Sequence, residues 1–186
     1  MQELKAFLTS TVQLTEEDSA VVLSYFKPKS LDKGKLLLKR GQIATSYYFL
    51  KSGALRFYYE QDRELTAWIV QSGEFFTEIS SLNPELPTRF NIEAVESAEL
   101  YCISKADMEL LYKQLPAWQE FGRKTWEGMA IRMIDEIIRF QTMTVEERYL
   151  EFLKKPGFMQ LISVKQLASY LGITPNALSR IRKNLR

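Results

Sequence analysis

The spacing of apolar and polar residues predicts a helix, a run of short strands, and then more helices. Residues 15–26 carry apolar side chains at helical spacing, and Thr15 followed by Asp18 is typical of a helix N-terminus. From about residue 27 to residue 103 the chain has short aromatic and β-branched runs separated by glycine turns. We predict strands at residues 35–39, 47–51, 55–60, 65–71, 90–95 and 100–103. Such strands indicate an antiparallel roll, sandwich or barrel.

Helical spacing returns at Ser104, which is a predicted N-cap with Asp107 three residues later. The longest helical pattern follows Pro116 and continues to about Met143. An apolar stripe at three-to-four spacing is formed by Phe121, Trp126, Met129, Met133, Ile137 and Phe140, and beside it lie Ala130, Ile134, Ile138 and Gln141. Two apolar sides need two partners, and we expect these to be the strand domain and a second copy of the helix. The alternative is a helix buried only against its own domain.

The segment from Val164 to Ile181 predicts a helix-turn-helix. Ala168 is small enough for a helix crossing, and Gly172 can adopt the positive φ that ends a first helix. Thr174 is the predicted cap of the second helix, with Pro175 at its first position. The apolar residues expected to hold the two helices together are Leu167, Leu171, Ile173, Leu178 and Ile181.

The second helix of this motif contains the candidate residues for contact with the major groove of DNA. If Leu178, Ile181 and Leu185 face inward, the opposite side is exposed. The candidate DNA-contacting residues are Lys165, Thr174, Pro175, Asn176, Ser179, Arg180, Arg182 and Lys183. Arg180 can pair with guanine and Asn176 with adenine, whereas Ser179, Lys183, Arg182 and Lys165 suit phosphates. The alternatives are a solvated charge at Arg180 and a capping role for Asn176.

Charge is distributed unevenly although the formal net charge is only +2. Residues 163–186 contain five basic and no acidic side chains, which leaves 20 basic and 23 acidic residues in the rest of the chain. This is the distribution expected when one part of a protein meets phosphate, although a solvated basic helix face would produce it too.

Several function classes are disfavoured by composition. The chain has no histidine and a single cysteine, Cys102, which removes histidine-dependent catalysis, a disulfide within the chain, and cysteine or histidine metal clusters. We therefore expect no enzyme activity, no metal and no cofactor. No apolar run approaches the roughly 20 residues of a membrane helix, and the N-terminus lacks the pattern of a secretory signal. A cytoplasmic location without membrane contact is the resulting expectation.

The chain as a whole resembles the Crp/Fnr family, and particularly its short members from Bacteroidetes-like bacteria. Residues 33–56 are similar to the glycine-punctuated start of the family's cyclic-nucleotide-binding roll, residues 72–78 to its phosphate-binding cassette, and residues 167–182 to its helix-turn-helix. The resemblance implies an α+β fold, in which an antiparallel double-stranded β-roll (a jelly roll) with flanking helices precedes a long dimerisation helix and a C-terminal helix-turn-helix without a full wing. The implied domains are an effector roll at 1–115, a dimerisation helix at 116–143 and a DNA-binding domain at 144–186.

Two departures from the family concern the effector site. Glu78 matches the cassette glutamate, but Thr77 stands where cyclic-AMP-binding members have glycine. Aligning Ala94 with the following strand places Thr88 at the position of the phosphate-binding arginine, and Arg89 falls one residue later, on the opposite face of a strand. The candidate pocket residues are Phe76, Thr77, Glu78, Thr88 and Arg89. Glu78 is more simply explained as the cap of a short helix than as a ribose ligand.

The resulting hypothesis is a sequence-specific DNA-binding transcription regulator that senses an unknown small effector or none, and not cyclic AMP. Its expected partners are double-stranded DNA and a second copy of itself, with RNA polymerase as a further candidate. The competing hypothesis is a ligand-sensing module whose roll and C-terminal helices bind protein partners instead of DNA.

Overall fold

Two antiparallel four-stranded sheets form the centre of the molecule. The computed structural model describes residues 1–60, 62–154 and 157–185, and the sheets have the orders β1-β8-β3-β6 and β2-β7-β4-β5. The strands are β1 (Lys27–Leu31), β2 (Leu36–Leu38), β3 (Ser46–Ser52), β4 (Ala54–Glu60), β5 (Glu64–Gln71), β6 (Phe75–Phe76), β7 (Asn91–Ala94) and β8 (Ala98–Ser104). Their apolar faces enclose a core of Leu50, Leu55, Phe57, Val70, Phe76, Ile92, Ala94, Ala98 and Leu100.

Helices flank the roll and form the C-terminal third of the chain. They are α1 (Gln2–Thr11), α2 (Glu16–Ser24), α3 (Ile79–Leu82), α4 (Lys105–Gln114), α5 (Pro116–Thr142), α6 (Val145–Leu153), α7 (Phe158–Leu161), α8 (Val164–Leu171) and α9 (Pro175–Asn184). Thr15 and Ser104 accept hydrogen bonds from the backbone N–H groups of Asp18 and Asp107, so both predicted caps are confirmed. The mixture of helices with two antiparallel sheets confirms the predicted fold class.

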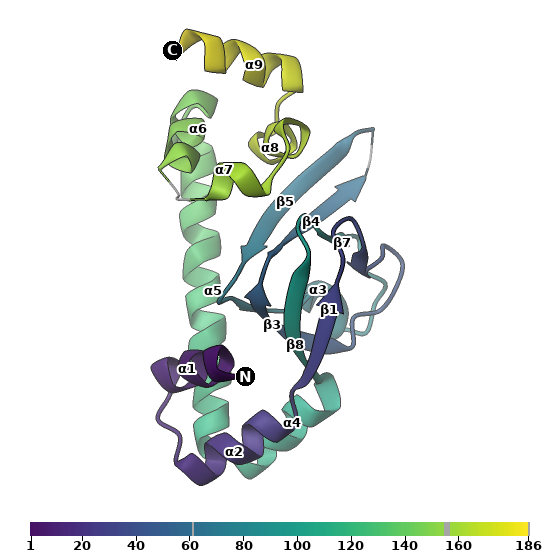
Figure 1. Ribbon diagram of the computed structural model, residues 1–186, viewed down its shortest axis with the longest axis vertical. Helices are drawn as coiled ribbons and strands as arrows, with labels where there is room; N and C mark the ends of the chain where they lie inside the picture. The colour runs from purple at the N-terminus through teal and green to yellow at the C-terminus, as the bar shows by residue number, and fades with distance from the viewer. Residues whose placement is uncertain (61, 155–156, 186) are drawn as a thin grey trace.

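The fold separates helices α2 and α4, at one end of the molecule, from helix α9 at the other end (Figure 1). Helix α5 runs along the length of the molecule, from α2 and α4 at one end to α6 near the other, where α9 lies (Figure 1). The hairpin of β4 and β5 extends from the roll toward α8 (Figure 1). The chain therefore connects the roll to its last two helices in two ways, through α5 and through this hairpin.

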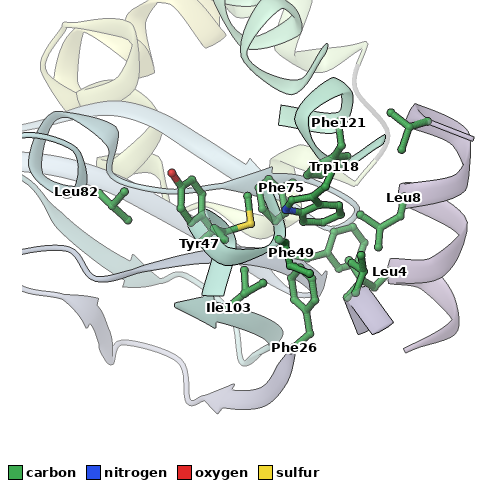
Figure 2. Packing of buried hydrophobic residues seen from close by; sticks show 14 of the residues in the cluster. Leu4, Leu8, Phe26, Tyr47, Phe49, Phe75, Leu82, Ile103, Trp118 and Phe121 are labelled. Carbon is green, nitrogen blue, oxygen red and sulfur yellow. The ribbon is translucent and has the colours of Figure 1, made fainter. Parts of the chain in front are cut away.

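An aromatic cluster fixes the N-terminal part of α5 to the roll. Trp118 and Phe121 on α5 are fully buried, and their ring centroids lie 4.4 Å apart. Phe121 also meets Phe75 of β6 edge to face at 5.3 Å, and Leu4 and Leu8 of α1 close the cluster from the other side (Figure 2). Buried rings of this size dominate the energetics of a core, so this half of α5 is held firmly against the roll.

The C-terminal half of α5 keeps its apolar side chains exposed. Between 46 and 60% of the accessible surface remains on each member of a set that comprises Ile131, Met133, Ile134, Ile137, Ile138 and Phe140. The apolar surface predicted from the sequence thus divides along the helix, because residues up to about 126 pack on the roll and those beyond 130 are uncovered within this chain.

Strands β1 and β6 and helix α1 were absent from the sequence prediction, and helices α6 and α7 were not predicted as separate elements. Strand β1 contains the residues Lys-Pro-Lys-Ser-Leu and lies at a sheet edge, so four of its five residues are exposed and no apolar alternation exists. Strand β6 has only two residues, and α1 buries only Leu4 and Leu8. Strands β1 and β6 and helix α1 are too short or too exposed to leave a periodic pattern.

Two negative findings apply to the described residues. No helix among them is both long and apolar enough to span a membrane. Nor do their cysteine and carboxylate side chains come together in any group of three that would hold a metal ion.

Candidate nucleic-acid interface and effector site

The local sequence dictates the geometry of the α8–α9 pair. Ser163 caps α8 in a reciprocal capping box with Gln166, and Gly172 ends the helix with φ +76°. Thr174 accepts a hydrogen bond from the backbone N–H of Ala177 at 3.2 Å, and Pro175 occupies the first turn of α9. The two helices therefore meet at the short turn predicted from the sequence.

A small apolar core fixes the angle between these helices. Ala168 is fully buried at the contact, and Leu167, Leu171 and Leu178 are almost entirely inaccessible. Tyr149, Phe152, Ile162 and Ile181 complete this cluster. Leu185 was predicted to face inward, but it remains 45% exposed, so this prediction was wrong. The physical reason is that α9 ends at Asn184, which leaves Leu185 as its cap beyond the last inward turn.

The predicted DNA-contacting side chains lie mostly on one exposed surface. The exposed members are Lys165 on α8 and Thr174, Pro175, Asn176, Ser179, Arg180 and Lys183 at the cap and on α9. None of them forms an ion pair with another described residue. The surface is therefore uncompensated positive charge with an amide and hydroxyls at the beginning of the helix.

Arg182 differs from the other predicted contacts. It is only partly exposed, its guanidinium lies 5.7 Å from the centre of the Tyr149 ring, and its Nε is buried without a hydrogen-bond partner. This geometry combines a cation–π contact with the packing of α9 on α6. The side chain thus points toward the protein more than its neighbours do.

A hydrogen-bonded contact joins the helix-turn-helix to the roll. Ser169 on α8 is 9% exposed, and its hydroxyl accepts from the backbone N–H of Thr66 at 2.8 Å and donates to the carbonyl of Glu64 at 2.9 Å. It also lies 3.0 Å from the Thr66 hydroxyl. Arg63, in the hairpin between β4 and β5, donates to the carbonyl of Gly172 at 3.2 Å. We call these five residues the β5–α8 contact.

A buried charge cluster lies beside this contact on the same hairpin. Arg56 is 3% exposed, and its guanidinium donates to Glu64 at 2.5 Å and to Glu93 at 2.6 Å. It also lies 3.4 Å from the Thr66 hydroxyl and stacks over Tyr58 at 4.2 Å. A buried arginine needs such partners, because an unpaired charge would be costly. Sequence reasoning missed this cluster, although an arginine between Leu55 and Phe57 was a usable signal.

A further link connects α8 to α5. The Tyr170 hydroxyl donates to Glu136 at 3.3 Å, and burial raises the pKa of Tyr170 above its ordinary value, so the phenol stays protonated. Together with the β5–α8 contact, this bond ties α8 to both parts of the molecule that lead back to the roll.

The predicted effector residues of the cassette are mostly occupied by internal contacts. Phe76 stacks on Tyr48 with a centroid distance of 5.5 Å, and the Thr77 hydroxyl donates to the carbonyl of Ser46 at 2.8 Å. Glu78 caps α3 by accepting from the backbone N–H and the hydroxyl of Ser80, as expected from the sequence. Its other carboxylate oxygen is buried without a hydrogen-bond partner.

The side chains of Thr88 and Arg89 point in different directions, as expected. However, the two residues do not lie on a strand. Thr88 is 3% exposed, and its hydroxyl accepts from the backbone N–H of Phe90 at 3.0 Å. Arg89 is exposed. Both precede β7, whose first residue is Asn91, so the opposite orientations arise in a loop. The structure therefore buries Thr88 and leaves the Arg89 cation exposed.

A cavity lies between the roll and the helix-turn-helix. It has a volume of about 340 Å³, and its lining includes Lys33 and Gly34 from the turn between β1 and β2, Glu93 from β7, and Ser163 and Gln166 at the start of α8. The five predicted effector residues do not line it. The cavity marks the place where the roll comes close to α8.

Comparison with known proteins identifies one domain of the chain and the fold that the chain shares with solved structures. Residues 28–114 match the cyclic nucleotide-binding domain. The cyclic AMP receptor protein of Thermus thermophilus is 30% identical over 105 residues, which is 55% of this chain and 48% of that protein, so the chain spans about half the length of this curated relative.

Solved structures extend the likeness over the whole chain. The c-di-GMP-responsive regulator CLP of Xanthomonas campestris has 20% identity and a TM-score of 0.73, with 92% of this chain and 91% of that chain covered. FixK2 of Bradyrhizobium japonicum has 21% identity and a TM-score of 0.69, covering 86% of this chain and 84% of FixK2.

A structure from Eubacterium rectale described under the crp/fnr family has 17% identity and a TM-score of 0.74, covering 92% of this chain and 83% of that one. Residues 28–114 thus form a cyclic nucleotide-binding domain. By sequence and structure, the chain is similar to Crp/Fnr homologues, which confirms the predicted resemblance.

Proposed function

We propose that this chain is a transcription regulator that binds double-stranded DNA in a sequence-specific manner through α9. The observation that carries the proposal is the exposed, acid-free face of α9, where Asn176 and Arg180 have no partner among the described residues, on a helix held rigidly by its own core. Arginine and asparagine are the side chains that pair with guanine and adenine in the major groove. Lys165, Ser179 and Lys183 are placed to contact phosphates, with Thr174 and Pro175 at the approach to the groove.

The proposal includes a homodimer formed through the exposed half of α5. Two recognition helices related by two-fold symmetry reach adjacent major grooves, and each subunit of such a dimer presents the same surface. The apolar set of Ile131, Met133, Ile134, Ile137, Ile138 and Phe140 supplies a surface that one chain alone leaves in water. The domain division that accompanies this proposal is 1–115 for the roll, 116–143 for the dimer helix and 144–186 for DNA binding.

A selection experiment tests sequence-specific binding. The full chain is used to select duplexes from a random pool, and the enriched sequence is then titrated by fluorescence anisotropy from 50 to 200 mM salt. We expect a palindromic site whose affinity falls steeply with salt, because each phosphate contact releases counterions. Protein that protects all sequences equally in a footprint would contradict the proposal and favour the hypothesis of a protein-binding module.

We further propose that cyclic AMP is not the effector. Thr77 fills the place of a cassette glycine and holds the Ser46 carbonyl, and Arg89 is exposed outside the roll. Without an inward cation, the cyclic phosphate would be desolvated with no charge partner.

Thermal unfolding with and without millimolar cyclic AMP provides the measurement, with the Thermus thermophilus cyclic AMP receptor protein as positive control. We expect an unchanged Tm for this chain, because a compound that does not bind the native state cannot stabilise it. A saturable rise in Tm would show that the cassette alignment is wrong.

A further inference from the structure

A row of aromatic rings crosses the interior of the roll between the two segments that hold the candidate effector residues. Phe76 of the cassette meets Phe57 of β4 edge to face, with ring centroids 6.0 Å apart. Phe57 also meets Phe90, the residue that directly follows Arg89, at 6.1 Å. The ring of Phe57 therefore bridges the cassette and the segment before β7, where a small molecule held by both segments would have to lie.

Phe57 is buried by its aromatic neighbours. It is fully inaccessible and belongs to the core of the roll. Trp68, its cross-strand neighbour on β5, stacks on it with a centroid distance of 4.5 Å. Trp68 remains 38% exposed, so the indole covers the phenyl ring from solvent, and Phe90 contacts the indole at 5.4 Å. A ligand could displace the ring of Phe57 only at the cost of these contacts.

The β4–β5 hairpin carries these rings on one face and the helix-turn-helix on the other. Successive side chains of a strand point to opposite faces. On β4, Phe57 lies in the core of the roll, whereas Arg56 lies beside the Thr66 hydroxyl of the β5–α8 contact. On β5, Val70 belongs to the core of the roll, and Ile69 packs against the core of the helix-turn-helix. Because one hairpin makes both sets of contacts, the packing inside the roll helps to fix the position of α8.

We propose that Phe57, covered by Trp68, takes the place of an effector, so that the chain holds its DNA-binding arrangement without any small molecule. This inference rests on the proposed function and concerns its regulation. A ligand shifts a protein between two arrangements only by contacting one of them better than the other. Here the contacts between the cassette and the segment before β7 come from a side chain, so they are present at all times. Phe57 is thus a positioning residue, which acts on DNA affinity through the hairpin and α8.

Removal of the ring, followed by its replacement with a free one, tests this inference. The variant is Phe57→Ala in the full chain, which leaves an apolar space beside Trp68, Phe76 and Phe90. An apolar cavity of this kind stays dry and takes up benzene. The matched control is Phe49→Ala on β3, because Phe49 is 1% exposed and belongs to the other aromatic cluster, which includes residues of α1 and α5.

Wild type is expected to bind the selected operator without a copurified small molecule, as measured by anisotropy and native mass spectrometry on one sample. Phe57→Ala weakens operator binding by about 5- to 150-fold, the usual range for coupling between two sites. Saturating benzene restores most of that affinity and raises the Tm of this variant, whereas it changes neither quantity for wild type. Phe49→Ala lowers the Tm but keeps the affinity of wild type, so lost stability alone does not move this readout.

Phe57→Leu serves as a second variant in case Phe57→Ala does not fold. Leucine keeps most of the apolar volume but removes the ring. Operator binding is therefore expected to weaken by a smaller factor than in Phe57→Ala, and benzene does not restore it, because too little space remains.

Three results would overturn the inference. Wild type that loses operator binding when a copurified small molecule is removed would show that an effector is required. A rise in the Tm of wild type with benzene would show that the roll still has room for a ring. Wild-type affinity in a folded Phe57→Ala or Phe57→Leu variant would show that the ring does not position α8. Failure of wild type to enrich any operator would instead refute the proposed function, and with it this inference.

Discussion

A variant that carries Ile134→Glu and Ile138→Glu is expected to be monomeric and to bind its operator at least about 100-fold more weakly than wild type. Both isoleucines lie in the uncovered half of α5, where they are 56% and 50% exposed in the single chain. In a symmetric dimer the two substitutions place four carboxylates in one apolar interface, where charge is costly to desolvate. A monomer presents only one recognition helix. It therefore loses the gain in affinity of about 10²–10⁴-fold that two linked binding contacts provide.

Sedimentation and anisotropy measure these two effects. The control is Lys113→Gln with Gln114→Glu on α4, which changes the net charge by the same −2 at exposed positions. Circular dichroism checks that the monomer stays folded, which we expect because the anchoring cluster of Trp118 and Phe121 lies in the other half of α5. A variant that remains dimeric at micromolar concentration would show that α5 is not the dimer surface.

The second large effect is expected from Arg180→Ala. A bidentate contact to guanine contributes about 1–3 kcal/mol of discrimination, and a dimer makes two such contacts, so affinity for the operator falls by at least about 30-fold. Preference at the contacted base pair disappears at the same time. Arg180→Lys does not rescue the preference, because lysine lacks the planar fork of the guanidinium.

Competition binding with operators altered at single base pairs provides the measurement. Lys113→Ala is the matched control, since Lys113 is an exposed, unpaired cation at the opposite end of the molecule. If Arg180→Ala weakened all sequences by the same factor and kept the base preference, Arg180 would be a phosphate contact and the proposed base contact would be wrong.

Local chemistry made much of this fold predictable. Capping residues such as Thr15, Ser104 and Thr174 act within three residues, so the sequence contains everything that fixes those helix ends. The same holds for Gly172, whose positive φ ends α8. Strands with one buried face leave an alternating pattern, and those strands were predicted close to their observed positions.

Contacts between distant segments were not predictable in this way. Nothing near Ser169 in the sequence indicates that its hydroxyl meets β5, a strand about one hundred residues earlier. Likewise, arginine is a residue type usually found at the protein surface. The burial of Arg56 depends on its ion pairs with Glu64 and Glu93, which lie on other strands. Arg182 turns toward Tyr149 for the same reason, because α6 supplies the ring.

The β5–α8 contact restricts how this chain can be recombined with its relatives. A chimaera that received residues 144–186 from a homologue with alanine in place of Ser169 would bury the N–H of Thr66 and the carbonyl of Glu64 without their present partner. Each buried group left unsatisfied costs about 1–3 kcal/mol, a large share of the stability of an ordinary domain. If α9 binds DNA as proposed, exchange of DNA specificity between this chain and similar proteins is therefore expected to succeed when the hairpin from Arg63 to Thr66 is transplanted together with the C-terminal helices.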